Sequence, residues 1–137
     1  MPAGIPLDPD EAAVMADPRF GSAIRLFNQG QWYACHDGFE ELWHETQGPC
    51  RPVLQGILQL AVSQLHLERG NRHGASVLMG EGIGRLRRCS PDSLGLDLRT
   101  LLSTAALHWQ ALQSGITTPA DGLPPLRITA ADRLSDG

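Results

Sequence analysis

The sequence has few cysteines, few aromatic residues, no lysine and no long apolar run. The shortage of cysteines and the lack of a long apolar run each exclude a class of protein. Its three cysteines are too scattered for a disulfide framework or a cysteine-based zinc site, so we expect free thiols. No apolar run approaches the roughly 20 residues that span a bilayer, and the N-terminus lacks the basic-then-apolar order of a signal peptide. We therefore expect a cytoplasmic protein with no membrane partner.

The charge and size of the chain favour one soluble globular domain. Its 137 residues, 42% of them hydrophobic, are enough to bury one core, so we expect a single domain over residues 1–137. The net charge of −4 argues against nucleic-acid binding, which relies on a basic surface. A small molecule or a second copy of the chain remains open as a partner.

Capping residues and apolar spacing predict an all-α fold, a single-domain bundle of about five helices with a buried central helix over about 52–69. The expected helices cover residues 9–16, 18–30, 31–47, 52–69, 73–88 and 98–113. Residues 116–137 are non-periodic and are expected to form an extended tail on the surface with a mobile end. The helix over 73–88 contains four glycines, which fit either close packing against a neighbour or a broken helix.

The stretch from Trp32 to His44 places ionisable side chains among aromatic ones. At about 100° per residue, Trp32, His36, Phe39 and Trp43 project within a narrow arc, with Glu40 at its edge. We expect this arc to be the most buried stripe of its helix. Buried polar groups need partners, so His36 and Glu40 should face hydrogen-bonding groups or a ligand.

The segment 52–69 supplies a candidate partner. Apolar residues occur almost all the way round it, which is typical of a central helix. Its polar residues Gln55, Gln59 and His66 nevertheless fall within about 40° of one another.

Two interpretations of this polar cluster stay open. In the first, His36, Glu40, Gln59 and His66 form a site for a divalent metal or a small ligand, with conceivable hydrolysis by a metal-bound hydroxide. Asp37, Trp43, Gln55 and Asn71 would support it. In the second, the same residues only bond to one another and fix how the helices pack, in a non-enzymatic interaction or assembly module. No catalytic residue is assigned.

The other motifs in the sequence give weaker indications of a functional site. The Glu41-x-x-His44 spacing of di-iron bundles has no second copy, and Cys35 diverges by about 100° from His36, so we expect an inert buried thiol. Basic residues near the ends of the helices over 52–69 and 73–88 fit a phosphate or acidic partner, or ordinary compensation of helix dipoles. These basic residues are Arg69, Arg72, His73, Arg85, Arg87 and Arg88.

The sequence resembles the bacterial family called domain of unknown function 309. The resemblance covers about residues 20–113. It is carried by His36-Asp37, Glu40 and Trp43, then Gln55-Gly56, Gln59-Leu60-Ala61, His66, Arg69-Gly70-Asn71 and Gly74-Ala75, with Phe27-Asn28-x-Gly30 and Gly95-Leu96-Asp97 on the flanks. The family implies a small helical bundle without an established activity. Asp37 stands where the family more often has glutamate, and Gly80, Gly82 and Gly84 replace helix-forming residues.

Overall fold

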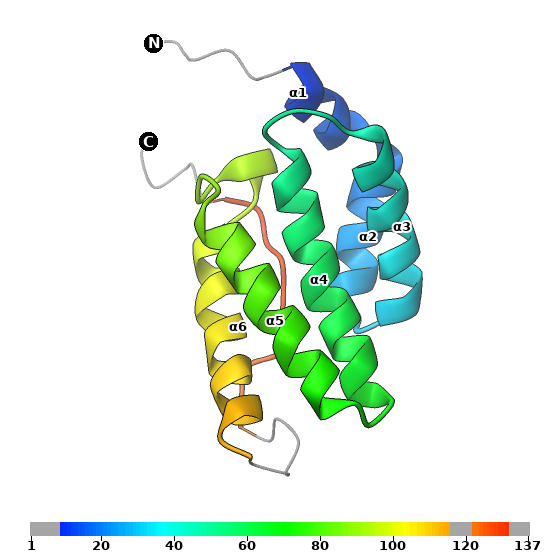
Figure 1. Cartoon of the computed structure of the whole chain (residues 1–137). Helices are drawn as coiled ribbons and strands as arrows, with labels where there is room; N and C mark the ends of the chain where they lie inside the picture. Colours follow the sequence, from blue (N-terminus) through cyan, green and yellow to red (C-terminus); the bar gives the residue numbers. More distant parts are fainter. Residues whose placement is uncertain (1–8, 116–121, 132–137) are drawn as a thin grey trace.

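The computed structural model describes residues 9–115 and 122–131, and the described chain is all-helical apart from one isolated β-bridge. Its elements are α1 (Pro9–Ala16), α2 (Pro18–Asn28), α3 (Trp32–Glu45), α4 (Arg51–Glu68), α5 (Arg72–Arg87), the short 3-10 helix η1 (Ser93–Gly95) and α6 (Leu98–Gln113). The predicted all-α bundle is confirmed (Figure 1). None of the described helices is long and apolar enough to cross a membrane.

Helix ends follow the local chemistry of the sequence. The side chain of Asp17 accepts a hydrogen bond from the backbone N–H of Arg19 at the start of α2, and Asp97 does the same for Thr100 at the start of α6. Gly30 and Gly70 adopt positive φ angles of 73° and 80° just after α2 and α4. Glycine favours this left-handed conformation, so the chain turns sharply at both points.

α4 is the central helix, as predicted. It lies between α3 and α5 and packs extensively against both (Figure 1). Eight of its residues are buried, including Leu54, Ile57 and Leu60, which are fully inaccessible. Burial on several sides explains why its sequence is apolar nearly all the way round.

The glycine-bearing helix α5 is continuous, because its glycines allow close contacts. A Cβ on Gly82 would lie 3.0 Å from the backbone oxygen of Gly56 on α4. A Cβ on Gly56 would lie 2.6 Å from Cγ of Leu86, and one on Gly80 would lie 2.7 Å from the indole of Trp109. Close packing rather than a broken helix therefore explains Gly80 and Gly82 of α5, whereas a Cβ on Gly84 would have no neighbour within 4 Å.

The prediction for the buried stripe of α3 was wrong by a rotation of the helix. Its buried residues are Cys35, Phe39 and Leu42. Their centre lies roughly 60° from that of the predicted aromatic arc, at about 100° per residue. The physical reason is that α3 packs on two helices: α4 on one side, and α2 on the other, where Gly38 lies against Ala23. Trp32, His36 and Trp43 are consequently only half-buried, and Trp43 lies against Arg51 at the start of α4.

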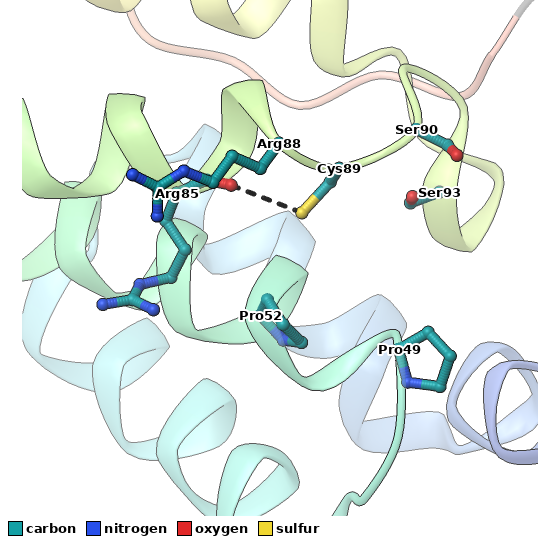
Figure 2. A pocket seen from close by; sticks show the side chains of 7 residues that line it. All are labelled: Pro49, Pro52, Arg85, Arg88, Cys89, Ser90 and Ser93. Atoms are coloured by element: carbon teal, nitrogen blue, oxygen red, sulfur yellow. Dashed lines mark hydrogen bonds between the residues drawn. The ribbon is translucent and has the colours of Figure 1, made fainter.

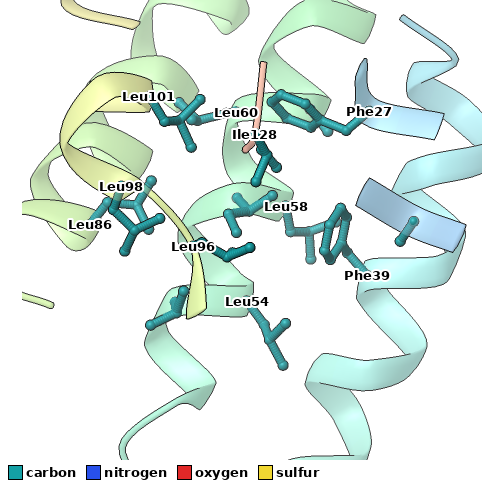
Figure 3. Close-up of a cluster of buried hydrophobic side chains, with 14 of the residues drawn as sticks. Phe27, Phe39, Leu54, Leu58, Leu60, Leu86, Leu96, Leu98, Leu101 and Ile128 are labelled. Carbon is teal, nitrogen blue, oxygen red and sulfur yellow. The ribbon is translucent and has the colours of Figure 1, made fainter. Parts of the chain in front are cut away.

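Residues 122–131, here called the C-terminal strap, are extended as predicted but do not simply lie on the surface. Leu126 and Ile128 are only 4% and 2% exposed. Figure 3 shows Ile128 among core side chains that include Leu60, Leu101 and Phe27. The strap is held by its backbone: Asn28 donates to the carbonyl of Ile128 at 2.8 Å and accepts from its N–H at 2.7 Å. The remaining predicted tail residues, 116–121 and 132–137, lie outside the described part.

Ile128→Ala is expected to lower the free energy of unfolding by about 2–5 kcal/mol, because it empties a buried site between helices. Equilibrium urea unfolding measures this change. The adjacent Arg127→Ala is the matched control, since its side chain is exposed and its loss should cost within about 0.5 kcal/mol. Equal effects of the two changes would show that the strap does not belong to the cooperative core.

Candidate functional site

His36 lies between two carboxylates of its own helix. Its Nδ1 is 3.3 Å from Oδ1 of Asp37, and its Nε2 is 3.5 Å from Oε2 of Glu40. The histidine side chain is 25% exposed, and those of Asp37 and Glu40 are 58% and 46% exposed. The predicted pairing of His36 with Glu40 is therefore present, at the surface edge of the bundle and not in its core.

Two side-chain nitrogens on this edge of α3 are buried without a hydrogen-bond partner. They are Nδ1 of His36, whose approach to Asp37 lacks hydrogen-bond geometry, and Nε1 of Trp43. Arg51 at the start of α4 covers the Trp43 ring, with its guanidinium carbon 4.3 Å from the ring centroid. A buried polar group of this kind in a native fold requires an explanation, such as local strain, an ordered water or a bound ion.

Gln59 faces α5. Its amide nitrogen donates to Oε1 of Glu81 at 3.1 Å, and its amide oxygen accepts from Nε of Arg85 at 3.1 Å. Gln55, one turn earlier on α4, is half-buried. The described contacts thus give Gln59 polar partners on α5, and no hydrogen bond is seen between it and His36 or Glu40.

His66 and Asn71 build the turn between α4 and α5. The side chain of Asn71 accepts from the N–H of Gly74 at 2.9 Å, and its amide nitrogen lies 3.2 Å from Nδ1 of His66. A Cβ on Gly74 would lie 2.6 Å from that amide nitrogen, so a glycine leaves room for the cap. This contact gives His66 and Asn71, both predicted site residues, a structural role at the turn that connects α4 to α5.

The predicted metal set of His36, Glu40 and His66 is not assembled. α3 and α4 run antiparallel from the contact of Trp43 with Arg51, so His66 lies roughly 12 Å further along the bundle axis than His36 at 1.5 Å per residue. Over the described residues, no group of three or more histidine, cysteine, aspartate or glutamate side chains is placed to hold a metal ion. The metal hypothesis gains no support from this geometry.

The predicted group of basic residues is divided between two ends of the bundle. Arg69, Arg72 and His73 lie at the turn from α4 to α5, whereas Arg85 and Arg88 lie at the opposite end of α5, about 20 Å away along the helix. The second pair lines a cavity of about 360 Å³, here called the arginine pocket. Its lining residues are Pro49, Pro52, Arg85, Arg88, Cys89, Ser90 and Ser93 (Figure 2).

Sequence reasoning missed most of the arginine pocket. Its two arginines were noticed, but the prolines just before and inside the first turn of α4, and the serines at and before the start of η1, reach it only through the packing of α4 against α5. The sequence contained one weak indication of the pocket. Ser90-Pro91 ends the helix and turns the chain, which places polar side chains beside the end of α5.

A smaller cavity of about 130 Å³ lies between α1, α2 and α3, and an ion-pair network forms part of its wall. Arg19 contacts Asp17 at 2.8 Å, Glu45 at 2.7 Å and Glu41 at 3.3 Å. The hydrogen bonds from Arg19 hold the pKa values of Asp17 and Glu45 below their usual range. With its guanidinium fully engaged, this arginine ties α2 to α3 and is not free for a ligand.

The cysteines behave as predicted. All three are free thiols, and burial raises the pKa of Cys35 to about 12, so this thiol is not a nucleophile near neutral pH. Its neighbour in sequence, His36, makes its closest polar contacts to carboxylates instead.

The fold and these contacts define a small helical-bundle protein with a polar edge on α3 and a separate arginine pocket. Residues 20–78 match the family model described as domain of unknown function DUF309. The predicted resemblance is confirmed over this stretch of the chain, which runs from α2 into α5. A search of curated proteins found no match to the chain.

Asn71→Ala is expected to destabilise the fold by about 1–2 kcal/mol, because it removes the N-cap of α5 together with the contact to His66. Urea unfolding measures the loss. Asn71→Asp keeps an acceptor for the N–H of Gly74 and should restore most of the stability, since aspartate caps as well as asparagine. An equally damaging Asn71→Asp would mean that the His66 contact, and not the cap, dominates.

The Arg19 network should make stability fall in acid. Asp17 and Glu45 have folded-state pKa values lowered from 3.8 and 4.5, so their contribution is present above these values and is lost as the pH falls through the lower folded-state ones. Arg19→Gln should therefore flatten the decline of the melting temperature between about pH 5 and pH 2. Arg25→Gln, on the exposed last turn of α2, should leave the decline unchanged; parallel profiles for all three proteins would refute the assignment.

Proposed function

We propose that this chain is a binding protein for a small polar ligand, which it holds at the edge of α3 formed by His36, Glu40 and Trp43. The observation that carries the proposal is the unpartnered, buried Nδ1 of His36, in a ring whose two nearest polar neighbours are carboxylates. A histidine kept only as a strut would normally have its ring nitrogens well bonded.

The contacts within this edge are too long for a tight structural network. Charge-assisted hydrogen bonds are typically about 2.7–2.9 Å, whereas His36 stands 3.3 Å and 3.5 Å from its carboxylates. By contrast, the buried hydroxyl of Ser63 donates to the carbonyl of Ala75 at 2.6 Å. The loose geometry around His36 supports a site that tightens when something binds.

The charge of the edge indicates the ligand class. Asp37 and Glu40 are both partly exposed and have only His36 as an ion-pair partner among the described residues. We therefore favour a ligand with a positive charge or several hydrogen-bond donors, such as an organic amine. Because no three metal-ligating side chains converge there, we do not assign a metal or a hydrolytic step to this edge.

A stability measurement separates a binding edge from a structural one. Glu40→Gln keeps the shape of the side chain and removes one of two neighbouring negative charges. For a binding edge we expect the free energy of unfolding to stay within about 0.5 kcal/mol or to rise. Ser63→Ala, which breaks a buried hydrogen bond, is the control and should cost about 1–3 kcal/mol. A Glu40→Gln loss as large as that of the control would identify the cluster as structural.

The ligand class is tested on the same proteins by the imidazole NMR signals of His36. Putrescine should shift these signals saturably in the native chain and fail to do so in Glu40→Gln. Zinc and manganese ions form a parallel series that tests the metal alternative directly. Absence of any saturable response to the diamine would contradict the proposed ligand class.

A further inference from the structure

The arginine pocket contains two arginines that have no direct carboxylate partner among the described residues. Within the part of the chain that the structure describes, neither Arg85 nor Arg88 makes a salt bridge, although the protein has fifteen acidic residues and only eleven basic ones. Arg19 shows the opposite arrangement, with three carboxylates around one guanidinium. We propose that the arginine pocket is a binding site for a small organic oxyanion, distinct from the edge of α3.

Gln59 fixes the arginine that lies deeper against α4. Its amide oxygen accepts from Nε of Arg85 at 3.1 Å, which leaves the two terminal nitrogens of the guanidinium available. The same amide donates to Glu81, one turn before Arg85 on α5. Carboxylate and guanidinium at this spacing commonly pair, but here the Gln59 amide stands between them, and Glu81 and Arg85 make no direct salt bridge among the described residues.

The shape and lining of the pocket select the size and type of the anion. Its volume of about 360 Å³ suits a metabolite-sized molecule. In Figure 2 the side chains of Arg85 and Arg88 extend to one side, whereas the hydroxyls of Ser90 and Ser93 lie on the other. The sulfur of Cys89 lies between them in this view. A phosphate or carboxylate would be bound by the guanidinium groups, which in this view lie at the ends of the arginine side chains that point away from Cys89 and the serines.

The other groups of the pocket are compatible with a negative ligand. Burial raises the pKa of the Cys89 thiol, which is consequently neutral near pH 7 and does not repel an anion. Pro49 and Pro52 come from the start of α4, where the positive end of the helix dipole adds a modest attraction.

Arg87 provides a matched control for the competing explanation. It is exposed in the last turn of α5, as Arg88 is at the cap, but it does not line the pocket. If these arginines only compensate the helix dipole or attract anions at long range, replacing either should have the same effect. If the anion binds in the pocket, replacing Arg88 should weaken binding more than replacing Arg87.

The test uses the full chain labelled with ¹⁵N and titrated with glycerol 3-phosphate, malate and uncharged glycerol. We expect saturable shifts of the backbone amides of Cys89, Ser90 and Ser93 with at least one of the two anions and none with glycerol. Arg88→Gln should weaken binding by about 10- to 100-fold, the value of a charge-assisted hydrogen bond, and Arg87→Gln by less than about 3-fold.

The outcomes separate the two anion types and the alternatives. A preference for glycerol 3-phosphate identifies a phosphate group as the recognised oxyanion, and a preference for malate identifies a carboxylate. The proposal is overturned if neither anion causes saturable shifts by about 10 mM, where a millimolar site would be largely filled. It is also overturned if Arg87→Gln weakens binding as much as Arg88→Gln. Neither result bears on the edge of α3, which is probed with a cation.

Discussion

The close approach of α4 and α5 is the constraint on which the rest of the structure depends. Gly56 and Gly82 let the two backbones meet, so the buried hydroxyl of Ser63 reaches the carbonyl of Ala75 on α5. The same approach brings Gln59 within hydrogen-bond distance of Arg85. A larger residue at either glycine would press on the partner helix, with Leu86 displaced by a side chain at position 56. Packing of two backbones thus sets both the core and the polar contacts above it.

The sequence predicted what local chemistry determines. Caps, glycines and apolar periods gave the helices and the central position of α4, because each of these signals acts within a few residues. The rotation of α3 was missed since the buried Cys35 is small, and since the approach of Gly38 to Ala23 depends on contact with α2. The strap was missed for a related reason: Leu126 and Ile128 enter a core supplied by distant helices, and an isolated pair of apolar residues in a proline-bearing segment gives no periodic signal.

In the candidate site, too, the contacts within one helix could be predicted from the sequence, whereas the contacts between helices could not. His36 and Glu40 are one helical turn apart, so their contact followed from the sequence alone. Whether Gln59 meets α3 or α5 depends on which neighbour its side of α4 faces, and wheel geometry on one helix cannot decide that. His66 was placed on the correct stripe of α4, yet its partner Asn71 belongs to the turn that follows. Polar residues of one helix stripe therefore serve different neighbours at different levels of the bundle.

The partners of each arginine distinguish an arginine that holds the fold together from one that is available to a ligand. Arg19 ties two helices together because three carboxylates meet its guanidinium, and this arrangement leaves no positive charge unpaired. At the end of α5 a neutral amide from Gln59 takes the place that a carboxylate would occupy beside Arg85. An amide can orient a guanidinium without cancelling its charge. The same contact that joins α4 to α5 therefore leaves a positive cavity in an acidic protein, at the end of the bundle where the chain turns into η1.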